Sequence, residues 1–498
     1  MDARAPSAKK RRSVAAESQG PERLSAPAPA ATEASGPDST AEPEESPTQE
    51  PPPAAGEDGV DRISGLPDAV LGDIVSLLPT KEAARTQTLA SRWRHVWRAA
   101  PLNLDHGDLN LGDGALAAAV SRILAAHPGP GRRFCIPPHL LHDRPTAVDA
   151  WLRSSALDNL QELDFWEDRP YWRQRREFPP SPPPASTFRF SATLRVATFR
   201  KCHLLDSSVE ALHFPQLKQL ALEYVEISEG SLHTMISCCP ALECLLLKSF
   251  GFCRIQISSN SLRSIGVGIM VDGKKPRLRE VVIVDAPCLE RLLYLQERMK
   301  INVSIISAPK LETLGCFSDR CYQSKLVFGT TAIEGLDVVN FAMVVHSVKI
   351  LAVNSCHINL DMVIGLMKCF PCLEKLYIKS YISGELNLWR RKHRNFIRSC
   401  DIRLKTIVLQ SYRGIRSQVN FASFFVLNAK ELELMRLVVD CRDYNEAFFA
   451  EQHGMLQMEK RASRGARLDF TKDRCQHELL HVNHVNHLSI TDPFHCRY

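Results

Sequence analysis

A short phrase that recurs along the chain constrains the fold more than any other feature of the sequence. The phrase reads Pro-x-Leu-(Glu or Lys)-x-Leu, and its strong copies begin at Pro215, Pro240, Pro287, Pro309 and Pro371. Weaker copies surround Leu194, Leu262, Leu278 and Val348. The strong copies lie 25, 47, 22 and 62 residues apart, so with the weaker copies the period is about 20 to 30 residues. An irregular period of this length predicts a solenoid in which each repeat stacks on its neighbours.

The chemistry of the phrase predicts the structure of each repeat. Proline ends the preceding segment, and the Leu-x-Leu alternation turns one face of a short strand inward. One repeat cannot bury that face alone. We therefore expect parallel strands that share a core and leave an extended concave face carrying Glu, Lys, Arg and Tyr. In or beside the phrases lie six cysteines that we expect to be small packing residues: Cys238, Cys239, Cys244, Cys288, Cys316 and Cys372.

The first 60 residues differ in composition from the rest of the chain. They hold 11 acidic and 6 basic residues, 10 of the 31 prolines, and no Trp, Tyr, Phe or Cys. Such a stretch buries too little apolar surface to offset chain entropy, so we expect a disordered spacer. Within it, Lys9, Lys10, Arg11 and Arg12 form a basic cluster that is either a nuclear import signal or a solvated run of charge. The remaining residues carry +11, because the whole chain carries +6 and this stretch −5.

Several classes of protein are not favoured by the sequence. No apolar run reaches the roughly 18 to 20 residues that cross a bilayer, and the N-terminus resembles no secretory signal, so we expect no membrane contact. The 16 cysteines are then expected to stay reduced. Motifs of phosphate loops, dinucleotide sites, serine hydrolases and zinc proteases are absent from the sequence, so we expect no catalytic residues and no enzyme.

Two groups of residues have spacings that suit metal ligands, and we interpret both as packing. Cys369 and Cys372 enclose a proline and have no partner pair at a zinc-like separation. Near the C-terminus lie Cys475, His477, His481, His484, His487, His495 and Cys496. The apolar alternation from Leu479 to Ile490 favours a closing strand there instead, so we expect neither a metal nor a cofactor.

Ordered structure is expected to begin at Asp61 with three short helices. Apolar spacing predicts these helices over residues 66–78, 81–89 and 91–99. Pro79 ends the first helix, Thr80 is the expected N-cap of the second, and two tryptophans share one face of the third. Helices this short cannot hide all their apolar side chains. They either dock on another chain or pack on the rest of this protein.

The residues of these helices resemble the plant F-box motif. The matching positions are Leu66-Pro67, Val70-Leu71, Ile74-Val75, Leu77-Leu78-Pro79, Ser91-Arg92-Trp93-Arg94 and Trp97. In that family the motif is a three-helix module that binds the small Skp-type adaptor of a cullin-RING ubiquitin ligase. The resemblance implies an adaptor-binding surface formed by Leu66, Pro67, Leu71, Ile74, Leu78 and Pro79, with Trp93, Val96 and Trp97 packing the helices together. Gly72 inside the first helix, and Ser91 where the family carries a basic residue, depart from the pattern, so we expect weakened docking.

The region after the repeats resembles a second plant module. Residues 400–439 are predicted to form a strand, a loop, a helix with an apolar face of phenylalanines, and another strand. This order is similar to the FBD domain that follows the repeats in many plant F-box proteins. Residues 459–470 are similar to an extension seen in grass members. The chain is thus identified as a member of the plant F-box, leucine-rich-repeat and FBD family, of grass type.

Two basic runs with aromatic residues, Trp166–Arg176 and Trp389–Arg394, have a composition that suits nucleic-acid binding. Interleaved aromatic and arginine side chains can bind nucleic acid through phosphate contacts and base stacking. The alternative, which we favour, is a surface loop and a solvated segment between repeats.

We therefore expect an α+β fold with four parts. These are a disordered tail (1–60), an all-α three-helix F-box (61–104), an irregular α/β leucine-rich-repeat solenoid (105–395), and an FBD cap with a C-terminal extension (396–498). The resemblance implies a non-catalytic substrate-recognition subunit of a Skp-cullin-F-box ubiquitin ligase, in the nucleus or cytoplasm, whose repeats and FBD region bind an unknown target protein. The alternative is a nuclear scaffold that binds protein or nucleic acid without a ligase role.

Overall fold

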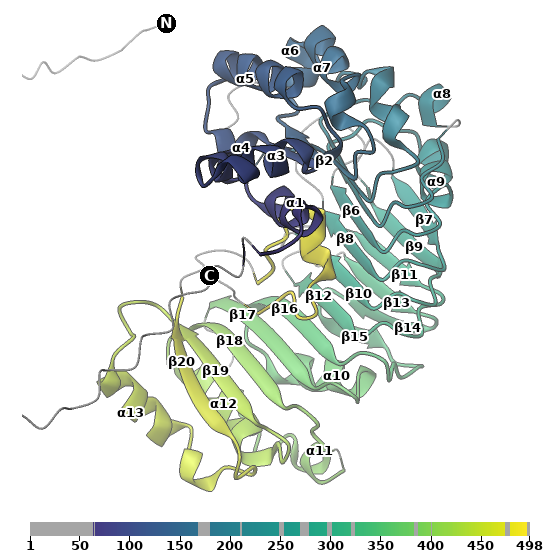
Figure 1. The fold of residues 1–498 in the computed structure, drawn as a ribbon. Coiled ribbons are helices and arrows are strands. Elements are labelled where there is room, and N and C mark those ends of the chain that lie inside the picture. Colours follow the sequence, from purple (N-terminus) through teal and green to yellow (C-terminus); the bar gives the residue numbers. More distant parts are fainter. Residues whose placement is uncertain are drawn as a thin grey trace, which may run out of the picture. The chain divides into compact units, whose positions relative to one another are not determined.

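A sheet of fourteen strands, each parallel to its neighbours, forms the centre of the structure (Figure 1). Its strands follow one another in sequence order. They are β1 (Leu102–Asp105), β2 (Gly131–Ile136), β3 (Glu162–Phe165), β4 (Val196–Arg200), β5 (Gln219–Glu223), β6 (Cys244–Lys248), β8 (Ser264–Gly268), β10 (Arg291–Tyr294), β12 (Thr313–Ser318), β16 (Ile350–His357), β17 (Lys375–Ile382), β18 (Thr406–Tyr412), β19 (Leu434–Val439) and β20 (Arg467–Lys472).

The structure is a computed structural model, and it describes most of the chain after the first 62 residues. The described residues are 63, 65–167, 180–209, 212–248, 253–268, 278–295, 301–319, 324–382, 387–399, 401–473 and 479–495. Arg62–Tyr498 forms one compact unit. The predicted tail and its Lys9–Arg12 cluster lie outside the described residues. Within these ranges, no helix combines the length and the apolar content that a membrane span requires.

One row of apolar side chains crosses the whole sheet in register and explains why the repeats stack. This leucine row consists of Leu104, Phe134, Leu163, Ala197, Leu220, Leu245, Ile265, Leu292, Leu314, Leu351, Leu376, Ile407, Met435 and Leu468. Five of its members are the last leucines of the strong phrases, and each is at most 1% exposed. Full burial of one leucine contributes about 1.5–3 kcal/mol. The predicted solenoid of parallel strands is confirmed.

The segments that connect successive strands are helical in two parts of the chain. These helices are α4 (His106–Leu109), α5 (Asp113–Ala126), α6 (Leu140–Asp143), α7 (Pro145–Leu152), α8 (Asp206–Val209), α9 (Glu229–Ser237), α10 (Leu360–Cys369), α11 (Arg394–Ser399), α12 (Arg416–Asn428) and α13 (Glu446–Met455). Mixed helix and strand agree with the expected α+β class.

Between residues 254 and 340 the connections are strands, which form a second sheet that the sequence analysis did not predict. Its order is β15 (Asp337–Asn340), β14 (Thr331–Glu334), β13 (Lys325–Phe328), β11 (Asn302–Ile305), β9 (Glu280–Asp285) and β7 (Arg254–Ser258). Each strand has only four to six residues. In β7, Ile255 and Ile257 are buried and alternate with exposed residues, as a half-buried strand requires.

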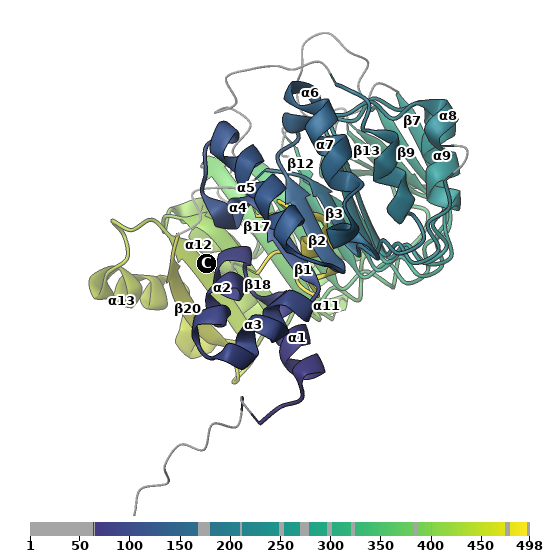
Figure 2. The same cartoon turned by 45° about the horizontal axis from the view of Figure 1, so that its top comes forward.

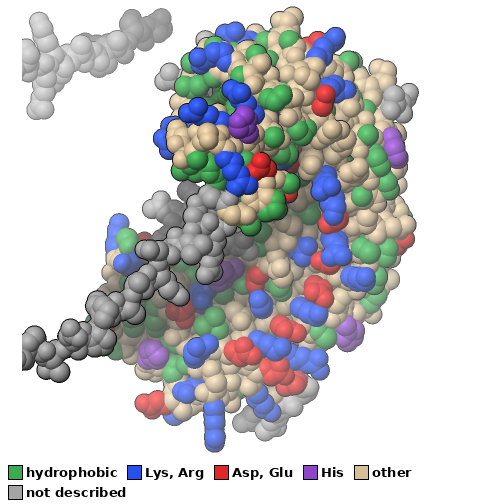
Figure 3. Space-filling view, viewed as in Figure 1, with side chains coloured by type: hydrophobic (Ala, Val, Ile, Leu, Met, Phe, Trp, Pro, Cys, Tyr) green, Lys and Arg blue, Asp and Glu red, His purple; other side chains and the backbone are tan. Residues whose placement is uncertain are grey.

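The charged position of each phrase forms a second row, the edge row, just before the strands. The backbone N–H of each member donates to the carbonyl of the preceding one at 2.8–2.9 Å, in the order Lys218, Glu243, Arg263, Glu290, Glu312, Lys349, Glu374, Lys405 and Glu433. Side chains of adjacent members pair, for example Lys218 with Glu243 at 2.9 Å and Lys349 with Glu312 at 2.8 Å. Positive and negative side chains are accordingly interleaved over the strands in Figure 3. These exposed pairs stabilise the fold by at most about 1 kcal/mol each.

Two of the expected domain boundaries do not coincide with breaks in the structure. Strand β1 spans the boundary expected at residue 104, and β17 pairs directly with β18 across the boundary expected at residue 395. The segment expected to form an FBD cap therefore continues the repeat sheet, because Ile407, Met435 and Leu468 extend the leucine row. Its predicted strand, helix and strand correspond to β18, α12 and β19.

Candidate docking face and concave-face site

Three helices precede the sheet: α1 (Asp68–Leu77), α2 (Thr80–Arg85) and α3 (Ser91–Ala99), with a 3₁₀ turn, Thr86–Thr88, after α2. Prolines 67 and 79 occupy the N-cap positions of α1 and α2. The expectation that Thr80 is an N-cap was wrong, since it is the first residue of α2. Its backbone N–H donates to the Asp108 carboxylate at 2.9 Å, and its hydroxyl donates to the carbonyl of Asn103 at 2.9 Å. The helices are thus tied to β1 and α4, at the end of the sheet seen in Figure 2.

The helices share a small core of their own. Its buried members are Leu71, Val75, Ala83, Trp93, Val96 and Ala100, with Leu66, Leu78 and Trp97 packed against them. Trp93, Val96 and Trp97 therefore lie where the sequence predicted packing residues. Leu71 was expected at the adaptor surface, but its side chain is 0% exposed and unavailable to a partner. It lies on the inward face of α1 with Val75, four residues later.

The face of α1 next to the inward one, about 100° round the helix, is apolar and exposed. Val70, Ile74 and Leu77 are 41%, 40% and 63% exposed, and Ile63 and Leu89 nearby in sequence are 58% and 66% exposed. We call Val70, Ile74 and Leu77, which share one face of α1, the docking face. Of the residues predicted to contact an adaptor, Ile74 belongs to it, Pro67 and Pro79 are exposed, and Leu66 and Leu78 are half-buried. The prediction missed Val70 and Leu77. The sequence signal for them was the 70, 74, 77 spacing, which is offset by one residue from the inward positions 71, 75 and 78.

A second site lies on the concave face of the sheet, on the side opposite the leucine row. The concave row consists of Asp105, Cys135, Asp164, Thr198, Ala221, Leu246, Gly266, Leu293, Gly315, Ala352, Tyr377, Val408, Arg436 and Asp469. It is in register except between Gly315 and Ala352, where the β12–β16 pairing shifts but the two residues are still neighbours. Its first four members are polar, whereas its middle is small or apolar. Of the expected Glu, Lys, Arg and Tyr, this row holds only Tyr377 and Arg436, so the expectation does not describe it.

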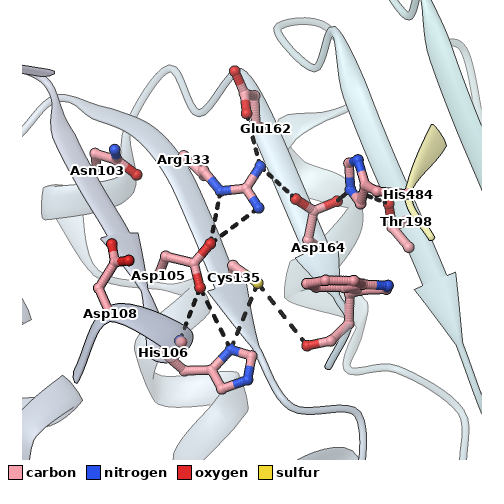
Figure 4. A network of polar contacts seen from close by, with 12 residues as sticks. Asn103, Asp105, His106, Asp108, Arg133, Cys135, Glu162, Asp164, Thr198 and His484 are labelled. Atoms are coloured by element: carbon pink, nitrogen blue, oxygen red, sulfur yellow. Dashed lines mark hydrogen bonds and ion pairs between the residues drawn. The ribbon is translucent and has the colours of Figure 1, made fainter. Parts of the chain in front are cut away.

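Arg133 on β2 is the centre of the polar part of this face (Figure 4). Its guanidinium lies 2.7 Å from Asp164, 3.0 Å from Glu162 and 3.1 Å from Asp105. Burial lowers the pKa of Arg133, but the three carboxylates, Asp164 foremost, outweigh this effect and raise it. Asp164 is 0% exposed, so a charge of opposite sign beside it is needed to offset the cost of removing its carboxylate from water.

His484, from the C-terminal end of the chain, completes this network (Figure 4). Its Nε2 lies 3.2 Å from the Asp164 carboxylate and 3.4 Å from the Thr198 hydroxyl, and its ring meets Trp166 edge-on at 5.6 Å. Burial lowers the pKa of His484, but the hydrogen bond and charge of Asp164 raise it above its ordinary value. Burial raises the pKa of Asp164, but His484 and Arg133 lower it below its ordinary value. Both shifts favour a charged pair.

Asp105, His106 and Cys135 bring three potential metal-ligand atoms within 4.8 Å of one another. The surroundings do not suit a cation. Burial and the charges of Asp164 and Asp105 raise the pKa of Cys135, so the thiol keeps its proton. The Asp105 carboxylate already accepts hydrogen bonds from Arg133 and from the backbone N–H of Gly107. We interpret the cluster as polar packing.

Comparison with known proteins agrees with the resemblance drawn from the sequence motifs. A family model described as FBD-associated F-box protein At5g56370, LRR repeats, matches residues 148–378. The chain is 33% identical to FBD-associated F-box protein At5g56370 of Arabidopsis thaliana over 37% of this chain and 42% of that protein. It is 27% identical to F-box/FBD/LRR-repeat protein At3g52680 of the same plant over 52% of this chain and 59% of that protein. The chain is thus similar, over its repeat region, to plant F-box proteins with LRR repeats and FBD domains.

The chain spans between 38% and 61% of the length of seven curated Arabidopsis relatives that it matches. One further Arabidopsis F-box relative, 26% identical, aligns over 77% of this chain and 90% of its own length. The matched residues 148–378 begin after α3 and end before β18. The roles of α1–α3 as the F-box and of residues 396–498 as the FBD domain with a grass-type extension therefore stay predictions.

The predicted cysteine and histidine groups are distributed over several environments. Cys239, Cys244 and Cys316 are buried as expected, whereas Cys238, Cys288 and Cys372 are only half-buried. Burial raises the pKa of Cys239 to about 12 and of Cys244 to about 11, as suits packing thiols. Cys475, His477 and Cys496 lie outside the described residues. Among the residues that are described, the Asp105 group is the one with metal-like geometry, and none of the C-terminal histidines belongs to it.

The two basic runs have partners within the chain. Trp166 donates its indole N–H to the carbonyl of Asn483 at 3.2 Å, and residues 168–176 of that run lie outside the described part. Trp389 packs edge-on against Phe424 with 5.6 Å between ring centroids, and Lys392 pairs with Asp361. Partners of this kind favour the interpretation as packed surface segments.

Proposed function

We propose that this chain is the target-receptor subunit of a Skp-cullin-F-box ubiquitin ligase. In this proposal α1–α3 are the F-box and dock on a Skp-type adaptor, which links the chain to a cullin-RING ligase. The repeat sheet with its FBD extension binds the target protein, in the nucleus or cytoplasm. The chain itself performs no chemistry, and its contribution is to raise the effective concentration of a target lysine near a charged ubiquitin-conjugating enzyme.

The docking face is the observation that carries the proposal. Sixteen large apolar side chains are exposed among the described residues. Five of them, the three of the docking face together with Ile63 and Leu89, lie within the 27 positions from Ile63 to Leu89. Exposing them costs free energy unless another chain covers them. The inward face of α1 is meanwhile fully packed, so the helices need no rearrangement to present this surface.

The alternative, a nucleic-acid-binding scaffold, is less well supported by the charge distribution. Binding of nucleic acid needs a patch of one sign that follows the phosphate backbone. In the edge row, however, basic residues alternate with acidic partners at 2.8–3.1 Å.

The test is a full-length chain in which Val70, Ile74 and Leu77 are each replaced by Asp. These side chains are exposed, so the chain should keep its melting temperature. Leu66 is a poorer choice because it packs on the helical core. Losing about 3 kcal/mol of apolar burial corresponds to a Kd for the adaptor that is weaker by about a hundredfold or more.

A control places the same charge on an exposed aliphatic residue of the repeat region. Ile306→Asp, at a position 67% exposed, should leave adaptor co-purification unchanged. Equal recovery of the adaptor with the triple variant and with the control would rule out the docking face, and with it the ligase function.

A further inference from the structure

Residues 479–495, here called the C-terminal segment, cover the concave face of the sheet. The closing strand predicted for them is wrong: they contain a 3₁₀ helix, Val485–Ser489, and no strand. Six of their apolar side chains are at most 8% exposed, namely Leu479, Leu480, Val482, Val485, Leu488 and Phe494. These six pack in one cluster with nine residues of strands β5 to β19 and with Leu295, which follows β10. The surface on which a target would bind is thus already occupied by the chain itself.

Polar side chains of the sheet hold the C-terminal segment at separate points. Lys248 on β6 and Arg291 on β10 donate to the backbone carbonyls of Val482 and Leu488, both at 3.2 Å. Further along, Lys375 and Tyr377 on β17 meet the carboxylate of Asp492 at 2.9 and 2.8 Å. With the His484–Asp164 pair on β3, the sheet recognises an imidazole, two carbonyls and a carboxylate. Grooves that bind peptides recognise the same kinds of group, namely backbone carbonyls and side chains at a fixed spacing.

The middle of the concave row is shaped for the C-terminal segment. Gly266 on β8 has no side chain, and a Cβ at that position would lie 2.9 Å from Cδ2 of Leu488. Ala221 and Ala352 in the same row are also small, fully buried and part of the shared cluster. Leu488 therefore sits in a depression that the missing side chain creates.

The C-terminal segment is separable from the core that holds the repeats together. The large cluster that contains the leucine row includes no residue of the segment. The segment packs instead in the second cluster, on the opposite face. Its removal would expose apolar side chains of the concave row without opening the leucine row. An exposed apolar groove of this kind requires an occupant.

We propose that the concave face is a peptide-binding surface whose resident ligand is the C-terminal segment, and that a target takes its place with the same chemistry. That chemistry is a histidine, an aliphatic residue four positions later and an acidic residue four positions further on, as in His484, Leu488 and Asp492. The proposal rests on the proposed function only in taking this face as the target-binding face. The target then competes with a tethered ligand, so only a target of sufficient affinity or concentration displaces the C-terminal segment.

The experiment uses the full chain with a protease site inserted between Asp473 and Leu479, cut after folding. The probe is a fluorescent synthetic peptide of residues 479–495, followed by anisotropy. The cut chain should exchange its own segment for the probe. The intact chain should bind the probe at least about tenfold more weakly, because the tethered segment has a high effective concentration.

Substitutions on both sides of the contact test its chemistry. Leu488→Asp in the probe and Gly266→Ala in the chain should each weaken binding by about tenfold or more, since each removes the burial of Leu488. The matched controls are Ser489→Ala in the probe, at an exposed position, and Gly365→Ala in α10, where a Cβ meets only an ordinary contact at 3.5 Å. Both controls should bind as the parent does.

Two results would contradict the proposal that the C-terminal segment is a displaceable ligand. Retention of the cut segment at every probe concentration, or equal affinities for the substituted and control pairs, would show that the C-terminal segment is a permanent part of the fold. If the insertion prevents folding, Leu488→Asp in the uncut chain replaces it and should raise probe binding above that of the parent chain, and unchanged binding overturns the proposal. No adaptor is present in these assays, so their failure is distinguishable from failure of the docking face.

Discussion

Replacing Arg133 by Met should be among the most damaging single changes in the sheet. The guanidinium lies within 2.7–3.1 Å of three carboxylates, and one of them, Asp164, is 0% exposed. Met keeps much of the volume of the side chain but removes its charge. Asp164 then keeps a buried negative charge with His484 as its remaining close cation.

The expected loss follows from the burial of Asp164. Removing one partner of a buried ion pair costs about 3–5 kcal/mol, whereas an exposed pair costs at most about 1 kcal/mol. The loss should be larger at pH 8 than at pH 6. The pKa of His484 is raised, so this residue is charged and compensates Asp164 at the lower pH but gives up its proton as the pH rises.

Urea unfolding followed by circular dichroism at both pH values measures this loss. Lys218→Met, which removes a cation from an exposed pair at 2.9 Å, is the matched control. Adding Asp164→Asn to Arg133→Met should recover stability, because the buried charge is then gone while the hydrogen-bonding group stays. The reasoning is refuted if Arg133→Met costs no more than the control, or if the double variant is less stable than the single one.

Two further predictions concern pH and packing. The His484–Asp164 ion pair should be fully formed between pH 3.8 and pH 6.5, the ordinary pKa values of the two groups. Above this range the pair weakens as the pH rises through the raised pKa of His484. Below this range it weakens as the pH falls through the lowered pKa of Asp164. Hydrogen exchange at Val485, corrected for its intrinsic pH dependence, should accelerate above pH 6.5, and His484→Gln should abolish that change. Leu71→Ala should destabilise the helices by about 2–5 kcal/mol, measured by thermal unfolding, because Leu71 is fully buried; an unchanged melting temperature would contradict its place in the helical core.

The repeat architecture could be predicted from the sequence because it depends on local rules. Proline ends a segment, and Leu-x-Leu alternation sets which face of a strand is buried, so each phrase specifies one strand of the sheet. The same phrase also marked the charged positions of the edge row. The second sheet escaped prediction because its strands have no phrase, only short alternations such as Ile255 and Ile257 in β7.

The two sites were only partly predictable, for different reasons. On α1, the exposed and buried stripes are offset by one residue, and the motif alone does not say which of Val70 and Leu71 faces the core. On the concave face, Asp164 and His484 are 320 residues apart, and no local pattern links them. The apolar alternation of residues 479–490 suits a strand as well as a segment lying across a sheet, so tertiary contacts decided between them.

The order of charges in the edge row also bears on how such a repeat array can change over evolutionary time. From Lys218 to Glu290, and again from Glu312 to Glu433, neighbouring members alternate in sign. Deleting or duplicating one repeat inside either stretch would place two like charges side by side, which is unfavourable in a sheet. Deleting or duplicating two adjacent repeats would restore the alternation. The array is therefore easier to shorten or lengthen by pairs of repeats, with the Glu290–Glu312 step as the point where the two alternating blocks meet.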